Sequence, residues 1–415
     1  IVAVGAHLND GNGTDSGHAR VYQFTDGSWV QMGNDIDGEY PDDLSGYDVD
    51  LSHDGEIVAV GAIRNDDGAT DGGHVRVFQY IGSTWEQLGD DIDGLQAHNY
   101  SGKSLSLSSD GSILATSGDM YVCVHQYNGT AWNILGEEIE RETGAHAQHS
   151  RSMVSLSGDG SVVALGEEYL NQVRVFEYSN STGWNQIGTI IGDGEFGRAV
   201  SLSGNGKVLA VGAPRASGIY GRVHVFGYDG TAWNSLGRPM QGIQTGENFG
   251  HAIEISNDGE RIAVGSWLYD NETCIAGDQN TGRVGLYEYD GDGSWVQLGD
   301  SPHGEDINDY LGYAVALSGN GRVLASGAHG NDDNGEKSGH VRVFGSAQVA
   351  SPGASGDPHF KMWNGETYDY HGLCDLVLLK NHGFKNGLGM DIHIRTKKMK
   401  QWSFISNVAL RIGED

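Results

Sequence analysis

The chain of 415 residues is long enough for one large domain and a smaller one, and it is strongly acidic. Its 25 Lys and Arg residues against 56 Asp and Glu residues give a net charge of −31, which argues against nucleic acid and anionic membranes as partners and favours cations. The 66 glycines beside only 6 prolines indicate many tight turns. No apolar run reaches the roughly 18 residues of a membrane-spanning helix, so we expect no membrane span.

The segment "LSHDGEIVAVGA", which begins at Leu51, recurs with small changes at Leu107, Leu156, Leu202, Ile255 and Leu317. Each copy predicts the end of a strand a, a tight turn and a nearly continuous apolar strand b. A strand c such as "GHVRVFQY" and a strand d such as "STWEQLG" follow. Four short strands repeated roughly every 40–50 residues are typical of one blade of a β-propeller.

Strand c occurs seven times, so the predicted fold is an all-β, seven-bladed β-propeller over residues 1–347. The first copy lacks strand a and the last lacks strand d, and we expect residues preceding Ile1 to supply both. Features that recur in many blades are interpreted as packing residues. These are the histidines that precede strand c (His18, His74 and His340) and the tryptophans of strand d (Trp29, Trp85, Trp132, Trp184, Trp233 and Trp295).

The stretch "FGRAVSLSGNGKVLAVGAP", residues 196–214, resembles the FG-GAP repeat of integrin α-chain propellers and their extracellular relatives. The repeat pattern covers residues 1–346, with "FG" at Phe196–Gly197 and Phe249–Gly250 and "GAP" at Gly212–Pro214. In that family the turn between strands a and b can hold calcium. Here the same turns read "SGDGS" and "SGNGK", which offer too few oxygen ligands, so we do not expect calcium there.

The loops between strands b and c are long and acidic in blades 1, 2, 6 and 7, which become neighbours when the ring closes. We therefore expect one raised acidic arc on one face. The spacing of oxygen ligands in these loops and in one turn of blade 6 suits Ca²⁺, the one cofactor expected, although solvated loops without an ion are the alternative. The candidate ligands are Asp10, Asn12, Asp15, Asp66, Asp67, Asp71, Asp290, Asp292, Asp332 and Asp333.

After a linker at residues 348–355, the segment "GDPHFKMWNGETYDYHGLCDLVLL" resembles the start of a von Willebrand factor type D domain. The matching positions are Gly356, Asp357, Pro358, His359, Gly365, Tyr368, Gly372 and Cys374. The resemblance implies a small C-terminal β module at residues 356–415, of a kind found in secreted polymer-forming and matrix proteins. It also implies that Cys374 pairs with a cysteine of the later half of such domains.

In some mucin-type relatives the sequence G-D-P-H cleaves itself between Asp and Pro. That resemblance makes Asp357, Pro358 and His359 candidates for self-cleavage, in which the Asp357 carboxyl attacks its own carbonyl and His359 assists proton transfer to the proline nitrogen. The alternative interpretation is that these residues only shape the entry turn of the module.

Five N-x-[ST] sequons, at Asn12, Asn99, Asn128, Asn180 and Asn271, are candidate glycosylation sites. Together with the two resemblances they predict a secreted glycoprotein of the extracellular matrix or cell surface. We expect an adhesion, matrix or surface-assembly protein whose propeller is an interaction disc and whose D-like module serves linkage or polymerisation. The expected partners are other extracellular proteins or glycans, and copies of the chain itself.

The propeller contains no G-x-S-x-G, H-E-x-x-H, C-x-x-C or P-loop motif, so we do not expect an enzyme. The alternative function is a polysaccharide-binding lectin, or an enzyme acting on polysaccharide, that uses the acidic propeller face. A cluster of carboxylates with Arg and Tyr at the mouth of the channel, absent from equivalent positions of other blades, would favour this alternative.

Overall fold

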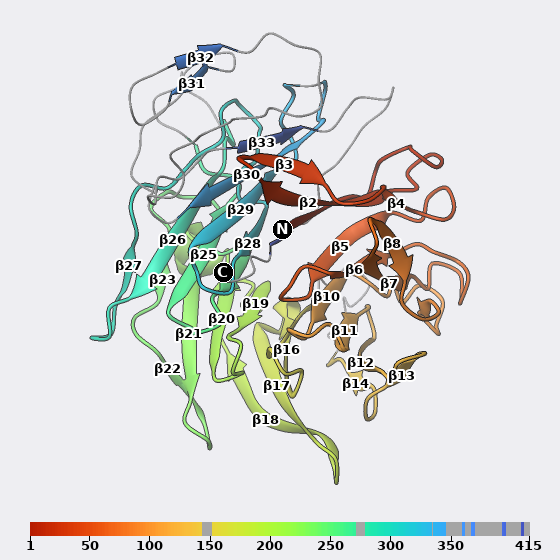
Figure 1. Ribbon diagram of the computed structural model, residues 1–415. Helices are drawn as coiled ribbons and strands as arrows, with labels where there is room; N and C mark the ends of the chain where they lie inside the picture. The colour runs from red at the N-terminus through yellow and green to blue at the C-terminus, as the bar shows by residue number, and fades with distance from the viewer. Residues whose placement is uncertain are drawn as a thin grey trace.

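The computed structural model describes residues 1–142, 152–270, 279–333 and 335–345, together with the backbone of four short strands between residues 359 and 410. It confirms an all-β propeller of seven blades, which follow one another around a central axis in chain order (Figure 1). In the described part of the chain, the helices are the single turn α1 (Ala216–Ile219) and the 3-10 turn η2 (Glu168–Leu170).

The four strands of each blade pair antiparallel in the order a, b, c, d from the axis outward. Blade 1 consists of β34 (Val408–Leu410), β1 (Val2–Ala6), β2 (His18–Thr25) and β3 (Ser28–Gln31), and blade 2 of β5 (Ser45–Leu51), β6 (Ile57–Ala62), β7 (His74–Ile81) and β8 (Thr84–Gln87). Blade 3 consists of β10 (Ser104–Leu107), β11 (Ile113–Ser117), β12 (Tyr121–Tyr127) and β13 (Trp132–Ile134), and blade 4 of β15 (Ser152–Leu156), β16 (Val162–Glu167), β17 (Gln172–Ser179) and β18 (Gly183–Ile191).

In blades 5 to 7 the strands are β19 (Ala199–Leu202), β20 (Val208–Ala213), β21 (Arg222–Tyr228) and β22 (Trp233–Ser235); β24 (Ile253–Ile255), β25 (Arg261–Ser266), β26 (Arg283–Tyr289) and β27 (Trp295–Gln297); β28 (Ala314–Leu317), β29 (Val323–Ala328), β30 (His340–Gly345) and β33 (Ile392–Arg395). Four two-residue strands, which the sequence did not predict, pair with the start of a strand c: β4 (Ile36–Asp37), β9 (Ile92–Asp93), β14 (Ile139–Glu140) and β23 (Met240–Gln241).

The ring is closed by strands from late in the chain. β34 takes the strand-a position of blade 1, with Val2 opposite Leu410, and β33 takes the strand-d position of blade 7, with His340 opposite Arg395. We expected residues preceding Ile1 in both places. Each place is the open edge of a sheet whose backbone groups need a partner, and the later segments provide one.

β33 and β34 lie within residues 356–415, where the sequence predicted a von Willebrand factor type D-like domain. The other described strands of that segment, β31 (His359–Lys361) and β32 (Thr367–Asp369), form a two-stranded sheet. These described strands give no support to the D-like domain, and the boundaries drawn for it remain a prediction.

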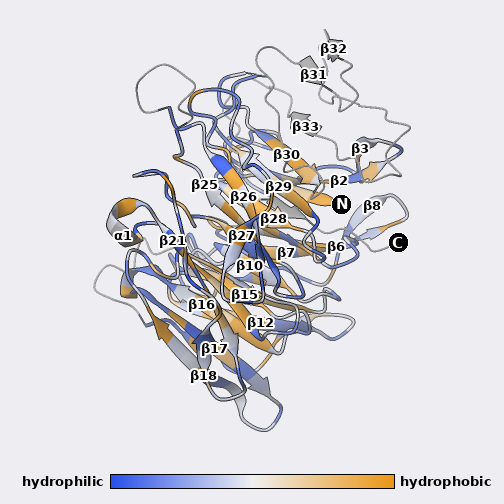
Figure 2. Ribbon diagram, turned by 90° about the vertical axis from the view of Figure 1, so that its left-hand side faces the viewer, coloured by the Kyte–Doolittle hydropathy of each residue, from blue (hydrophilic) through white to orange (hydrophobic). Residues whose placement is uncertain are grey.

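The core lies between the blades. Seven clusters of buried apolar side chains each join two neighbouring blades, for example Val2 and Val4 of β1 with Val341 and Val343 of β30. Strand b is apolar along its length because both of its faces are covered, and Figure 2 shows the apolar residues on the interior strands and the hydrophilic residues on the loops.

Two sets of hydrogen bonds also join the blades. The tryptophans of strand d pack between blades, as predicted, and four donate from Nε1 to the main chain of the preceding blade, as Trp132 does to the Leu88 carbonyl at 2.7 Å. In blades 2 to 6, each a–b turn also donates a backbone N–H to the a–b turn of the next blade. The chain of bonds runs His53 to Ser109, Ser109 to Gly158, Gly158 to Gly204, Gly204 to Asn257 and Asn257 to Gly319, at 2.7–3.0 Å.

Candidate functional site

The channel along the axis encloses a cavity of about 180 Å³, and we call its end on the side of the b–c and d–a loops the mouth. One position of the repeat lines the cavity at this end in most blades, and a second position contacts the first in several blades. The residue five before the serine of the a–b turn is Tyr47, Lys103, Ser152, Arg198, His251 or Tyr313. The residue that follows the end of the strand-b motif is His7, Ile63, Asp119, Glu168, Pro214, Trp267 or His329. These positions differ between blades whose strands otherwise repeat, so we take the mouth as the candidate site.

Six of these residues form a continuous contact along one side of the mouth, from blade 4 to blade 7. We call this set the mouth arc, and its members are Glu168, Arg198, His251, Trp267, Tyr313 and His329. None of the six was predicted from the sequence as a site residue. The signal that could have found them is the variation of these two positions when the seven repeats are laid over one another.

The polar end of the mouth arc is centred on Arg198. Its Nη1 lies 3.3 Å from Oε2 of Glu168, and its Nη2 lies 3.3 Å from Nε2 of His251. A guanidinium can only donate, so Nε2 of His251 accepts this hydrogen bond. This end of the arc is therefore a guanidinium held between a carboxylate and an imidazole.

The other end of the arc is aromatic. The Trp267 indole lies 5.3 Å from the His251 ring and packs edge-on against Tyr313 at 5.5 Å, measured between ring centroids. The His329 ring lies 4.3 Å from Tyr313 and stacks on Tyr310, a residue of the neighbouring d–a loop, at 4.9 Å and 7°. Trp267 is only partly buried, and its Nε1 has no hydrogen-bond partner among the described residues.

The opposite side of the mouth is different in kind. Lys103 forms a close ion pair with Asp119, and its ammonium lies 5.0 Å from the centre of the Tyr100 ring. The carboxylates at the two rim positions, Asp119 and Glu168, are thus both held in ion pairs.

Deeper in the channel, the polar side chains connect blades. Oδ2 of Asp48 accepts a hydrogen bond from the Leu105 amide of the next blade at 2.7 Å, and Oγ of Ser104 accepts from the Val154 amide at 3.1 Å. Around the wall, backbone amides of the next blade donate in the same way to the side chains of Asp50, Ser106, Ser155 and Ser201. The wall of the channel is therefore mainly structural, and the mouth is the part available to a ligand.

The predicted calcium loops are ordered by their own backbone. The first carboxylate of each loop in blades 1, 2 and 7 accepts the amide five residues further on: Asp10 from Asp15 at 2.9 Å, Asp66 from Asp71 at 2.7 Å, and Asp332 from Lys337. In blade 1 the Asn12 side-chain amide donates to the Gly38 carbonyl at 2.8 Å. Burial and the neighbouring charges of Asp10 and Asp42 raise the pKa of Asp15.

The second carboxylate of two of these loops lies against a histidine of strand c. Asp67 lies with Glu39, His74 and Asp91, and Asp333 lies with Glu305 and His340; a third group is His18, Asp35 and Asp37. The recurrence of these histidines in the sequence predicted a packing role. All three are buried, and desolvation lowers the pKa of His18 and of His74 to about 4, so both are neutral at pH 7.

In blade 6, Asp290 accepts backbone hydrogen bonds from Asp292 at 2.8 Å and Ser294 at 2.9 Å, and these bonds lower the pKa of its carboxyl. Both aspartates are exposed on the turn between β26 and β27. Their carboxylates, like those of Asp10 and Asp15, are not gathered with a third ligand residue in the described part of the chain.

The sequons differ in exposure. Asn12, Asn128 and Asn180 are exposed, whereas Asn99 is only 7% exposed and its Oδ1 accepts the Met120 amide at 3.1 Å. Asn271 lies outside the described residues. So do Asp357 and Pro358, and of His359 only the backbone, in β31, is described, so the self-cleavage candidates stay a prediction.

The model of the FG-GAP repeat matches residues 304–344, which form most of blade 7. No curated protein matches the chain. In the described part of the chain, no helix is long and apolar enough to cross a membrane.

Solved propellers are similar in fold. A putative 6-phosphogluconolactonase from Bacteroides uniformis is 15% identical with a TM-score of 0.59, over 89% of this chain and 94% of that one. A second, from Bacteroides fragilis, is 14% identical with a TM-score of 0.58, over 98% and 96%. The periplasmic gluconolactonase of Pseudomonas aeruginosa is 17% identical with a TM-score of 0.57, over 85% and 95%. At these identities the likeness concerns the fold alone. The chain is therefore a seven-bladed β-propeller that contains an FG-GAP repeat.

Proposed function

We propose that the protein is an extracellular recognition protein of the matrix or cell surface, and that its propeller binds a saccharide at the mouth arc. The observation that carries the proposal is the aromatic cluster of Trp267, Tyr310 and Tyr313 beside the fixed Arg198–Glu168 pair. This proposal joins the adhesion function expected from the sequence with its alternative, a lectin, because the ligand is placed at the channel mouth.

A saccharide matches both ends of the arc. Its apolar C–H faces pack on aromatic rings, and its hydroxyl groups pair with a guanidinium and a carboxylate that are already oriented by each other. Arg198, Glu168 and His251 hold one another in place, so little side-chain entropy is lost on binding.

The proposal is a binding function rather than an enzymatic one. The rim carboxylates are occupied by Arg198 and Lys103, and the propeller sequence contains no catalytic motif. The lactonase-like propellers share only the fold with this chain, so they do not support a lactonase activity for it.

Several sequence predictions remain part of the proposal. They are secretion, partners that include other extracellular proteins, glycans and copies of the chain, and calcium at the acidic loops. A von Willebrand factor type D-like linkage module from residue 356 also remains, and it rests on the sequence resemblance alone. A melting temperature that is the same with calcium and with a chelator would count against calcium in these loops.

The test is a glycan-array screen of the purified protein, followed by titration calorimetry with the saccharide that binds. Trp267→Ala and Tyr310→Ala should each weaken binding by about tenfold or more, since a stacked aromatic ring contributes on the order of 1–2 kcal/mol. The matched control is Tyr100→Ala, which removes the equivalent tyrosine on the opposite side of the mouth. Absence of any saccharide ligand, or equal affinities for the wild type, Trp267→Ala and Tyr310→Ala, would contradict the proposal.

A further inference from the structure

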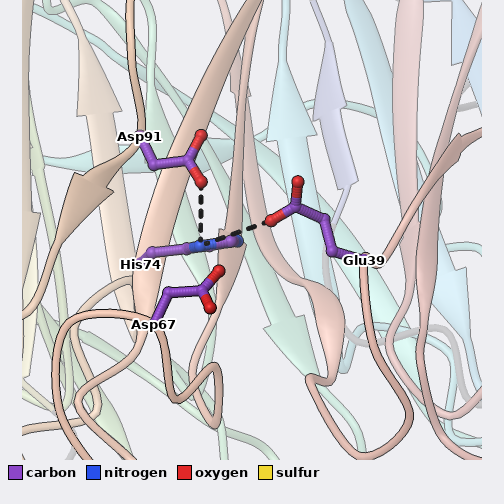
Figure 3. Close-up of side chains that lie close together, drawn as sticks. All are labelled: Glu39, Asp67, His74 and Asp91. Carbon is purple, nitrogen blue, oxygen red and sulfur yellow. Dashed lines mark ion pairs between the residues drawn. The ribbon is translucent and has the colours of Figure 1, made fainter.

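Four side chains from two blades meet on the loop face, away from the mouth arc. Glu39 lies in the loop between β4 and β5, Asp67 in the loop between β6 and β7, His74 at the start of β7, and Asp91 beside β9. We call these four residues the His74 cluster. One ligand atom of each lies within 4.8 Å of the others, and Figure 3 shows the three carboxylates around the imidazole.

The His74 ring is the observation that points to a ligand. It is 0% exposed, and neither ring nitrogen makes a hydrogen bond with any described residue. Its Nδ1 lies 3.6 Å from Oδ2 of Asp91 and 3.9 Å from Oε2 of Glu39, and both distances are too long for hydrogen bonds. A buried polar group without a partner costs about 1–3 kcal/mol, so a stable fold needs something to compensate it.

We propose that the His74 cluster binds one divalent transition-metal ion between blades 1 and 2. Ligand atoms at about 2.0–2.2 Å from a common ion lie about 3–4.4 Å from one another. The separations of Nδ1 of His74 from the Asp91 and Glu39 oxygens, 3.6 and 3.9 Å, fall in this range. The ion would accept the lone pair of Nδ1 and neutralise carboxylates that otherwise repel one another.

The charge state of the cluster agrees with this geometry. Burial and the nearby Arg76 lower the pKa of His74 to about 4, so the ring is neutral at pH 7, which is the form that binds metals. Burial raises the pKa of Glu39, and its acidic neighbours Asp91, Asp67 and Asp43 raise it further, against the opposing effect of Arg76. An ion at this place relieves that repulsion.

The remaining oxygens of the cluster are already positioned. Oε1 of Glu39 lies 3.4 Å from Nη1 of Arg76, and Oδ1 of Asp91 accepts from the Gln87 side chain at 2.6 Å. The oxygens that face His74 are the other member of each carboxylate. Arg76 and Gln87 are therefore positioning residues that aim Glu39 and Asp91 at the imidazole.

Blade 1 has the equivalent histidine and carboxylate, but there the arginine holds the carboxylate. There Arg20 donates from Nε and Nη2 to both oxygens of Asp35 at 2.8 and 2.6 Å, so the carboxylate opposite His18 is occupied. In blade 2 the equivalent Arg76 instead donates to the Asp37 carbonyl and faces Glu39. The two blades thus provide a site and its internal control.

The ligand set selects the class of metal. A neutral imidazole nitrogen suits Zn²⁺, Co²⁺ or Mn²⁺, whereas Ca²⁺ and Mg²⁺ prefer oxygen ligands alone. Glu39 and Asp67 are exposed above the buried ring, so an ion can reach the cluster from solvent. The site shares Asp67 with the blade 2 loop in which the sequence predicted calcium, and it adds Glu39, His74 and Asp91.

The test uses the full chain and Co²⁺ as a visible-absorption probe, with excess Mg²⁺ present to mask weak binding to the acidic surface. We expect bound Co²⁺ to give a d–d spectrum, and Zn²⁺ to displace it. Asp91→Asn should lower the Co²⁺ affinity by about 10–100-fold, and His74→Gln should do the same. Asp35→Asn, at the equivalent carboxylate of blade 1, should leave the affinity unchanged.

Asp91 is partly exposed, so Asp91→Asn keeps the test valid even if His74→Gln fails to fold. No Co²⁺ binding by the wild type in excess Mg²⁺ would overturn the proposal. So would an affinity of Asp91→Asn equal to that of the wild type, or a loss of affinity in Asp35→Asn as large as in Asp91→Asn.

Discussion

Nε1 of Trp85 donates a 2.6 Å hydrogen bond to the main-chain carbonyl of Met32, so the outer strand of blade 2 is fastened to blade 1. Trp29, at the same position of blade 1, is 3% exposed and its Nε1 has no hydrogen-bond partner among the described residues. The two tryptophans therefore share a packing position and differ in one hydrogen bond.

Trp85→Phe should lower the free energy of unfolding by about 1 kcal/mol more than Trp29→Phe. Both substitutions remove the same indole atoms, but only the first leaves a carbonyl without its donor. Urea unfolding of the two variants and the wild type measures the difference. Equal losses would show that the tryptophans act through packing alone.

The buried ion pair of blade 4 should be sensitive to the loss of one partner. Arg174 donates to both oxygens of Glu167 at 2.9 and 2.7 Å, and their side chains are only 7% and 2% exposed. Arg174→Met leaves a buried carboxylate without its cation and should cost about 3–5 kcal/mol. Chemical denaturation checks the value.

The control for that experiment is the exposed pair of Arg215 and Glu195, whose side chains are 65% and 34% exposed. Arg215→Met should change the stability by less than about 1 kcal/mol, since solvent screens the pair. A cost for Arg174→Met as small as that of Arg215→Met would contradict the expected effect of burial.

Asp309 should give the fold a pH dependence. Burial raises the pKa of its carboxyl from 3.8 to about 6, although the Glu305 and Asp306 amides donate to it. Because the folded state binds the proton more tightly, the stability from this group is full below about pH 4 and is lost as the pH rises through 6.

Relative to wild type, Asp309→Asn should therefore gain stability between pH 4 and pH 7, by up to about 3 kcal/mol. Thermal unfolding across this pH range measures the difference, and Asp306→Asn, an exposed aspartate of the same loop, controls for the loss of one charge. A difference that does not vary with pH would contradict the raised pKa.

The sequons should differ in occupancy. Asn128 and Asn180 lie on exposed c–d turns, whereas Asn99 is buried against Gly118 and Met120. Mass spectrometry of material from the native source should find a glycan at Asn128 or Asn180 and none at Asn99. Bare asparagines at every sequon would argue against passage through a secretory pathway.

The blade count and the position of strands a to d could be predicted because each repeat has its own strand and turn signals. The His74 cluster could not. Glu39 and His74 are far apart in the sequence and belong to neighbouring blades, so only the packing of one blade on the next brings them together. The recurrence of the histidine also suggested a packing role. The surroundings of His74 and His18 differ because Arg20 donates to the Asp35 carboxylate, whereas Arg76 donates to the Asp37 carbonyl.

The mouth arc could be predicted from the sequence in part. Laying the repeats over one another marks the two variable positions, but it does not reveal that Arg198 reaches both Glu168 and His251. The closing strands were missed for a different reason. β33 and β34 are only 4 and 3 residues long, and short segments carry little periodicity.

The pairing of β1 with β34 also sets the order in which the molecule is made. Val2 pairs with Leu410, so every residue between them must be synthesised before blade 1 receives its inner strand. Until then β1 and β30 carry open edges that can join another nascent chain, and the entropy of closing so long a loop must be overcome in one step. Biosynthesis of this protein should therefore depend on chaperones that cover unpaired strands, more than the regular packing of its blades suggests.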